Sequence, residues 1–280
     1  MPSIFTLLRW LFRILLLVFQ HKKQMDKVRA VTNEATRANE ALQAALVPYK
    51  KGDYDTALQL TESLKQNGKE TSHYTFMRGA LLFEKGQFAE AEQLLRKSIT
   101  VEENKQLLAL RCSTLGQLLM KTERYDQAMK CFETGLQHWP GKGGLHRDMA
   151  EALLRRGGDP QQALQLAKQA VVEESNPGSS EEGSRNINLA ENLATLAWAV
   201  ANAEGPRPEV DQLVARAVPM VGKEVVSSLA HVHYHAGLAY VPFEDFDETR
   251  KHMEAAAQLD PNGRWGRDAK AMLDALCQHQ

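Results

Sequence analysis

The sequence predicts an all-α fold, an α-solenoid of about six helix–turn–helix repeats. The first observation is a phrase that recurs six times, beginning at residues 52, 86, 123, 158, 205 and 244. The second is a residue five places into each phrase that is usually small, with spacings of 34, 37, 35, 47 and 39 along the series Ala57, Ala91, Ala128, Ala163, Val210 and Thr249. The third is that no run shows the polar–apolar alternation of a strand, so we expect no sheet.

The composition is that of a folded protein. Of the 280 residues 43% are apolar and 25% charged, and 34 Lys and Arg against 35 Asp and Glu give a net charge of −1. Broad binding of nucleic acid needs a strongly basic face, so we expect no nucleic-acid partner. The three cysteines include no C-x-x-C pair. This excludes a disulfide framework and a cysteine-rich zinc site, and it fits a reducing compartment.

Residues 1–23 differ from this average because they contain no acidic residue and are largely apolar from Ile4 to Phe19. On a helix, Arg9 and Arg13 share one narrow polar stripe. We expect an amphipathic helix in a membrane interface, which contacts the membrane through Arg9, Trp10, Arg13, Lys22 and Lys23. A short transmembrane anchor, a transit peptide and a buried core helix are the alternatives. If the segment spans the bilayer, the basic residues that follow it place the rest of the chain in the cytoplasm.

The repeat array follows at 24–263, with residues 24–36 joining it to the first segment. Each copy has two helix-length amphipathic stretches and a turn that often contains Gly or Asp, as at 156–159. A second small residue precedes the first by about twelve places at Ala45, Gly79, Gly116, Ala197 and Gly237. Gly inside a helix costs about 1 kcal/mol relative to Ala, so its recurrence indicates close packing. The fourth copy carries Glu151 at this place.

Two segments depart from the repeat. The longest spacing contains ESNPGSSEEGSRN at 174–186, which is rich in Ser, Gly and Glu, so we expect a flexible insert there. Residues 264–280 place apolar side chains at helical spacing, at Trp265, Ala269, Met272, Leu273 and Leu276. This spacing predicts a helix that caps the apolar face of the last repeat.

The paired small residues, the spacing of about 34 and the prolines at 140 and 261 resemble the tetratricopeptide repeat (TPR) family. The resemblance implies an elongated, right-handed superhelix in which each repeat contacts mainly its neighbours and a concave groove binds a peptide. It implies that this groove is lined by His73, Phe76, Phe83, Gln117, Lys121, Asp148, Arg155, Trp198, His231 and Tyr234. Trp198 fits the core equally well, because its helix is apolar nearly all round. The Lys and Asn set with which one subclass grips chaperone C-termini is not reproduced, so that activity is not expected.

Few residues suggest chemistry. His231 and His235 share a helix face at i, i+4, a spacing that can hold zinc, but with no third ligand evident we expect groove or surface histidines and no metal site. Cys112 and Cys131 fit core positions. The sequence GKGG at 141–144 is a turn at a helix start that could hold an anion weakly. Phosphate-loop and nucleophile-elbow motifs do not occur in the sequence, so we expect neither catalysis nor a cofactor.

These patterns predict a membrane-associated, non-enzymatic scaffold that binds protein or peptide partners. Two alternatives stay open. One is a soluble matrix or periplasmic adaptor from which the N-terminal segment has been removed. The other is a subunit of an enzyme complex with a weak histidine metal site.

Overall fold

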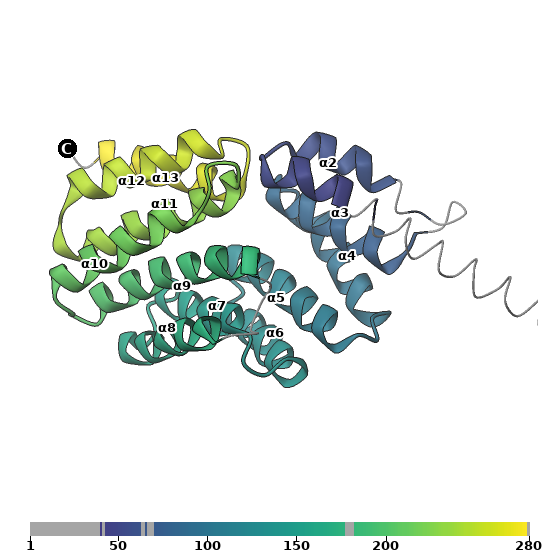
Figure 1. Ribbon diagram of the computed structural model, residues 1–280, viewed down its shortest axis with the longest axis horizontal. Helices are drawn as coiled ribbons and strands as arrows, with labels where there is room; N and C mark the ends of the chain where they lie inside the picture. The colour runs from purple at the N-terminus through teal and green to yellow at the C-terminus, as the bar shows by residue number, and fades with distance from the viewer. Residues whose placement is uncertain (1–39, 41–42, 63–64, 66–69, 177–181, 279–280) are drawn as a thin grey trace, which may run out of the picture.

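The structure is a computed structural model that describes residues 40, 43–62, 65, 70–176 and 182–278 (Figure 1). Within these residues it contains helices and turns but no strand, which confirms the all-helical prediction there. Residues 43–50 are helical. The helices that follow are α2 (Tyr54–Thr61), α3 (Ser72–Glu84), α4 (Phe88–Thr100), α5 (Lys105–Lys121), α6 (Tyr125–His138), α7 (Gly143–Arg155), α8 (Pro160–Ser175), α9 (Glu182–Asn202), α10 (Arg207–Ala217), α11 (Val226–Tyr240), α12 (Phe246–Leu259) and α13 (Arg264–Gln278), with short 3-10 segments η2 (Val218–Met220) and η3 (Val241–Phe243).

Each of the six helix pairs turns through one residue in the left-handed backbone region. The six are Gly52 (φ 74°), Gly86 (79°), Glu123 (60°), Gly157 (67°), Glu204 (58°) and Glu244 (55°). At the end of α3, the N–H groups of Gly86 and Gln87 donate to the carbonyls of Phe83 and Leu82, each at 2.9 Å. These two bonds form the Schellman pattern that closes a helix C-terminus. The left-handed conformation costs a side chain such as Glu about 1–2 kcal/mol, so its recurrence in all six pairs shows that the repeat geometry requires it.

The recurring small residues lie where the two helices of a pair approach most closely. A β-carbon added to Gly79 would lie 3.1 Å from Cγ of Leu95, and one added to Gly116 would lie 2.3 Å from the Phe132 ring. Each glycine of a first helix therefore fits against a large side chain of the second helix. This confirms the close packing that the sequence predicts at these two positions.

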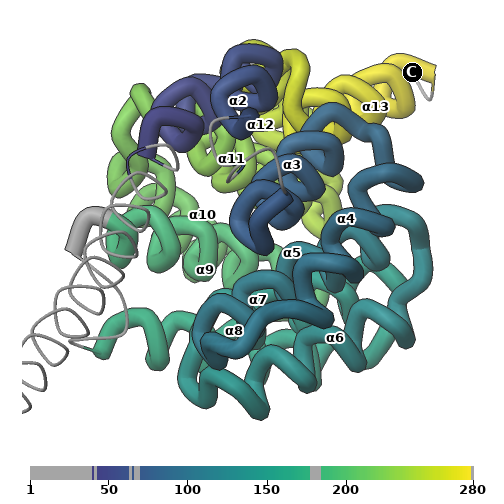
Figure 2. The backbone as a smooth tube through the Cα atoms, turned by 90° about the vertical axis from the view of Figure 1, so that its right-hand side faces the viewer, coloured from purple at the N-terminus to yellow at the C-terminus, as the bar shows by residue number. Residues whose placement is uncertain are grey.

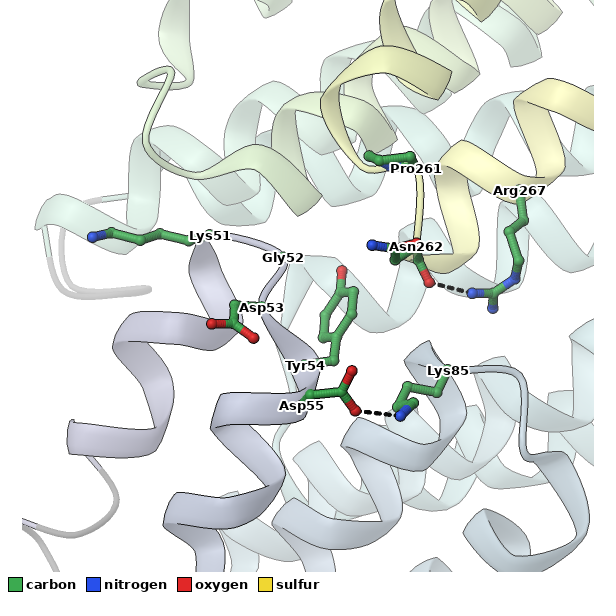
Figure 3. A pocket seen from close by; sticks show the side chains of 9 residues that line it. All are labelled: Lys51, Gly52, Asp53, Tyr54, Asp55, Lys85, Pro261, Asn262 and Arg267. Atoms are coloured by element: carbon green, nitrogen blue, oxygen red, sulfur yellow. Dashed lines mark hydrogen bonds and ion pairs between the residues drawn. The ribbon is translucent and has the colours of Figure 1, made fainter.

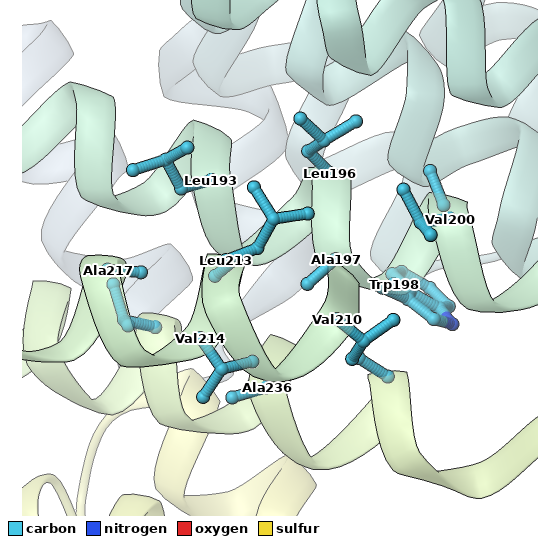
Figure 4. Close-up of a cluster of buried hydrophobic side chains, with 14 of the residues drawn as sticks. Leu193, Leu196, Ala197, Trp198, Val200, Val210, Leu213, Val214, Ala217 and Ala236 are labelled. Atoms are coloured by element: carbon cyan, nitrogen blue, oxygen red, sulfur yellow. The ribbon is translucent and has the colours of Figure 1, made fainter. Parts of the chain in front are cut away.

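Apolar side chains fill the spaces between the helices in several clusters. The most extensive one lies on α9, α10 and α11 and includes Leu193, Ala197, Trp198 and Val210 (Figure 4). A second cluster, around Leu118 and other buried residues, joins α3 to α7. A third joins α13 to α11 and α12 through buried residues that include Trp265, Ala269 and Met253. As predicted for a capping helix, α13 covers the apolar face of the last pair.

The prediction of a flexible insert at 174–186 is wrong at both ends of that range. Residues 174 and 175 complete α8, and residues 182–186 belong to α9, which is 21 residues long. Residues 177–181 lie outside the described part of the chain. The side-chain amide of Asn188 donates to Oε1 of Glu174 at 3.1 Å, which holds the two helices together. Part of the longest repeat spacing therefore lengthens helices.

The expected membrane helix at 1–23, with Arg9, Trp10, Arg13, Lys22 and Lys23, lies outside the described residues, and so does the junction at 24–36. Among the residues that are described, no helix combines the length and the hydropathy that crossing a bilayer requires.

The array bends until its two ends meet, with the start of α2 beside the turn between α12 and α13 (Figure 2). Tyr54 begins α2, and its hydroxyl donates to both carboxylate oxygens of Asp260, at 3.0 and 2.9 Å. Arg267 on α13 donates to the backbone carbonyl of Glu84 on α3 at 2.7 Å. The expectation that each repeat contacts mainly its neighbours is therefore wrong for the two ends. We call this end-to-end contact, made by Tyr54, Glu84, Asp260 and Arg267, the closure.

Candidate functional site

The concave face is formed by the first helices of the pairs, which contact one another in the order α3, α5, α7, α9, α11 and α13. The ten residues predicted to line a peptide groove all lie on α3 to α11. Five of them are buried (Phe83, Asp148, Trp198, His231 and Tyr234) and five are half-buried (His73, Phe76, Gln117, Lys121 and Arg155). All except His73 and Phe76 contact another of the ten or a side chain of α13. Their role in peptide binding stays a prediction.

Arg264, the first residue of α13, lies at the centre of this face. Its Nη1 donates to Oε1 of Gln117 at 2.9 Å, and its Nε lies 3.4 Å from Oε1 of Glu84. The guanidinium also lies over the rings of Phe83 and Trp265, 4.9 and 4.5 Å from their centroids. Burial raises the pKa of Glu84, and the charge of Arg264 opposes this rise. One cation of the last helix therefore joins α3 and α5 to α13.

Asp148 on α7 is a second point of connection. Its carboxylate accepts hydrogen bonds from Ser113 at 2.7 Å, from Gln117 at 2.9 Å and from Arg147 at 2.9 Å. Arg147 also donates to Glu191 on α9 at 2.5 Å. Burial alone would raise the pKa of Glu191, but His231 and Arg147 outweigh it and lower that pKa. These bonds connect α5, α7 and α9 through the buried side chains of Asp148 and Arg147.

Glu151, also on α7, accepts a hydrogen bond from Nε of Arg155 at 2.7 Å. The Arg155 guanidinium lies over the rings of Trp198 and Tyr234, 5.9 and 5.6 Å from their centroids. Trp198 is 8% exposed and belongs to the apolar cluster of α9, so the structure places it in the core. Tyr234 is 6% exposed and packs on Trp265 of α13.

The remaining predicted groove residues lie nearer the edge of the concave face. Lys121 forms an ion pair with Asp268 of α13. The Phe76 ring lies under the guanidinium of Arg111, 5.5 Å from the ring centroid. His73 is half-buried in the first turn of α3. These side chains offer less polar surface to a ligand than the sequence suggests, because α13 already binds one of them.

His231 and His235 are buried on the inner side of α11, at 3% and 0% exposure. Their rings lie 4.4 Å apart, and the His231 ring stacks on Trp265 at 4.1 Å. Burial lowers the pKa of His231 to about 3, so its imidazole is neutral at physiological pH. Among the described residues, these two histidines and Glu151 form the one group that could hold a metal ion.

A cleft opens beside the closure (Figure 3). It has a volume of about 570 Å³ and is lined by Lys51, Gly52, Asp53, Tyr54, Asp55, Lys85, Pro261, Asn262 and Arg267. Lys85 forms an ion pair with Asp55, and Arg267 donates to the backbone carbonyl of Asn262. Lys51, Asp53 and Asn262 are exposed. Both signs of charge are therefore available at the mouth of the cleft.

The other candidates from the sequence are structural. Gly143 begins α7, and a β-carbon there would lie 2.6 Å from the carbonyl oxygen of Ala170, so this glycine allows α7 to approach α8. Cys112 is buried and Cys131 half-buried, and both line a cavity of about 410 Å³. Burial raises the pKa of Cys112 to about 11, which keeps its thiol protonated and poorly nucleophilic at neutral pH.

The role of several residues on the concave face could not be predicted from the sequence. They are the residues that hold this face together: Glu84, Glu151, Glu191, Asp260, Arg264 and Trp265. Glu151 was marked in the sequence, because it replaces the small residue that other copies carry. A carboxylate at a packing position indicates a buried polar partner. The other five interrupt no recognisable pattern. Of these, Glu84, Asp260 and Arg264 contact residues from the opposite end of the array.

A family model described as a tetratricopeptide repeat matches residues 42–104 and 113–180. Among solved structures the chain is similar to TTC0263, a TPR protein of Thermus thermophilus, at 17% identity and a TM-score of 0.51 over 78% of this chain and 98% of that one. It is also similar to PilF of Pseudomonas aeruginosa, at 14% identity and a TM-score of 0.49 over 86% and 99% of the two chains. MamA of Desulfovibrio magneticus RS-1 matches at 13% identity and 0.44 over 66% and 94%.

Proposed function

We propose that this chain is a tetratricopeptide repeat protein and acts as a non-enzymatic scaffold that binds protein partners, which the family match over 42–104 and 113–180 and the stacked helix pairs support. The concave face supports the absence of catalysis, because three of its arginines pair with carboxylates: Arg147 with Glu191, Arg155 with Glu151 and Arg264 with Glu84. The cavity that Glu151, Arg155 and Trp265 border there has a volume of only about 20 Å³. That is the space of about one water molecule and too small for a substrate.

The observation that carries the proposal is the cleft beside the closure. Its volume of about 570 Å³ lies within the range of ligand-binding clefts and suits a short peptide segment. The exposed side chains of Lys51, Asp53 and Asn262 present a cation, an anion and an amide at its mouth. We propose that a peptide segment carrying both acidic and basic residues binds there, with its polar backbone groups facing these side chains.

The ten predicted groove residues give the second binding mode. A partner that uses them must displace α13, since Arg264, Trp265 and Asp268 already contact them. The cleft needs no such displacement, and for this reason we favour it.

We also propose that residues 1–23 attach the protein to a membrane, with the repeat array on the cytoplasmic side. The sequence supports this, because the segment has no acidic residue and its basic residues Arg9, Arg13, Lys22 and Lys23 fit the anionic head groups.

A photo-cross-linking amino acid placed at Lys51 tests the binding site. Lys168 is the matched control, because it is an exposed lysine on the outer helix α8. We expect a partner to cross-link at position 51 and not at position 168. Lys51→Glu should weaken the binding of the purified partner by about tenfold, or roughly 1.4 kcal/mol. Equal cross-linking at both positions would contradict a specific site. Cross-linking at His73 but not at Lys51 would favour the concave face.

Carbonate extraction of cell membranes tests the attachment. We expect the Arg9→Glu, Arg13→Glu double variant to leave the membrane, because head-group attraction is worth about 1 kcal/mol per basic residue and two charges are reversed. A double variant that resists extraction would show that the segment spans the bilayer. A wild-type protein that never sediments with membranes would contradict the attachment itself.

A further inference from the structure

Two helices that are far apart in the sequence bring three metal-binding side chains together on the concave face. Glu151 comes from α7, and His231 and His235 come from α11. One ligand atom from each residue lies within 4.8 Å of the other two, and all three residues are at most 3% exposed. The separation between Nε2 of His235 and Oε1 of Glu151 is 3.4 Å. In a tetrahedral site with metal–ligand bonds of about 2.0–2.1 Å, ligand atoms lie about 3.4 Å apart, so this pair already has the required separation.

The second nitrogen of each imidazole is held as it is in metal sites. Nδ1 of His235 lies 2.9 Å from the hydroxyl of Thr195, and Nδ1 of His231 lies 3.4 Å from Oε1 of Glu191. Histidine ligands almost always donate their other ring N–H to a carboxylate, a carbonyl or another polar group, which fixes the ring and the tautomer. In both rings this arrangement leaves Nε2 as the nitrogen with a free lone pair.

The two Nε2 atoms are buried, and neither makes a hydrogen bond within the described part of the chain. A buried acceptor without a partner is costly, and few native side chains leave one. Two such atoms beside a carboxylate are the strongest indication of an absent ligand on this face. Neutral imidazole, with one nitrogen bonded and the other free, is the form that binds a metal.

The surroundings also accept a cation. Three ion pairs on α7 and α9 lie in this part of the face, and they contain more carboxylates than guanidinium groups. The carboxylates are those of Asp148, Glu151 and Glu191, and the guanidinium groups are those of Arg147 and Arg155. Arg155 takes one lone pair of Glu151 at 2.7 Å, but a carboxylate offers about four. The cavity of about 20 Å³ that Glu151 borders has room for one water beside this carboxylate.

We propose that Glu151, His231 and His235 bind one zinc ion, with water as the fourth ligand, and that the ion joins α7 to α11. Two imidazoles and one carboxylate form a ligand set that suits this metal. The site goes beyond the scaffold function, because it stabilises the concave face and requires no partner. Zinc binding is measured on the chain alone, without a partner, so a loss of zinc binding can be distinguished from a loss of partner binding.

The test uses the full chain after metal removal with EDTA, titrated with Zn²⁺ in a calorimeter. We expect one ion per chain with a Kd of about 1 μM or tighter. His235→Gln and Glu151→Gln each remove a ligand and should weaken binding by at least about 100-fold. Thr195→Val keeps all three ligands but removes the partner of Nδ1, and it should weaken binding by about 10-fold or more.

His233→Gln is the control, because His233 lies on the same helix and pairs with His252 at 2.9 Å outside the cluster. This variant should bind Zn²⁺ like the wild type. Co²⁺ provides a second measurement, since a tetrahedral site with nitrogen ligands gives strong visible absorption. The proposal is overturned if Zn²⁺ binding is not saturable, if His233→Gln weakens it as much as His235→Gln, or if bound Co²⁺ shows only the weak spectrum of an octahedral ion.

Discussion

Replacing Tyr54 with Phe removes a single hydroxyl group from the closure and leaves the packing of the ring unchanged. The hydroxyl donates to the carboxylate of Asp260 at 2.9 and 3.0 Å, and Asp260 is 1% exposed. Apart from this hydroxyl, Asp260 accepts the backbone N–H of Gly263 at 3.1 Å. A hydrogen bond to a charged group contributes about 1.5–3 kcal/mol, and water cannot easily replace it at a buried carboxylate. We therefore expect Tyr54→Phe to lower the free energy of unfolding by about 1.5–3 kcal/mol.

Urea denaturation followed by circular dichroism measures this loss, and amide hydrogen exchange locates it. Exchange should accelerate first in α2 and in the turn between α12 and α13, because the Tyr54–Asp260 contact joins these two segments. Tyr125→Phe is the control, because the Tyr125 hydroxyl bonds no other residue in the described part of the chain. If Tyr54→Phe stays within about 0.5 kcal/mol of the wild type, or if both variants lose the same amount, the closure does not stabilise the fold.

Leu118→Ala should lower the free energy of unfolding by about 2–5 kcal/mol, because its side chain is fully buried and leaves a cavity. Tyr234→Ala should cost about 3–5 kcal/mol, since Tyr234 packs on Trp265 and is only 6% exposed; a wild-type melting temperature would instead place its ring in an open groove. With EDTA present, lowering the pH from 7 to 5 should cost about 2 kcal/mol for each of two histidines, because burial lowers the pKa of His231 to about 3 and that of His252 to about 4, whereas both are about 6.5 in the unfolded chain. The unfolded chain binds more protons in this window, so stability is lost as the pH falls. Urea denaturation at several pH values measures this loss. If His252→Gln leaves the dependence of the unfolding free energy on pH unchanged, His252 does not contribute to it.

The repeat architecture could be predicted from the sequence because it depends on local and periodic signals. The close approach at Gly79 and Gly116 follows from a glycine recurring at one place in a helix. The pair turns follow from the start of each phrase, because the structure has a left-handed residue at that position or one place before it in all six pairs. A helix–turn–helix unit specifies these features within about 34 residues, and no distant part of the chain is needed.

The closure could not be predicted, because it depends on small rotations between successive repeats that add up along the array. Tyr54 and Asp260 are separated by 206 positions, and neither belongs to a recognisable motif. The same reason explains why the sequence predicts a groove position for Tyr234. In an open array its helix face would be free, whereas here Trp265 of α13 packs against it. The substitution of Glu151 for a small residue was the one sign of a polar interior in the sequence.

The closure has a consequence for how this protein can evolve. Open repeat arrays gain or lose whole units with little penalty, because every unit meets only the units beside it. Here, deleting or duplicating one helix pair would shift Asp260 and Arg267 by a full repeat and separate them from Tyr54 and Glu84. The number of units is therefore constrained by geometry. We expect variation among related chains to accumulate in the turns and on the outer helices, while the unit count between Tyr54 and Asp260 stays constant.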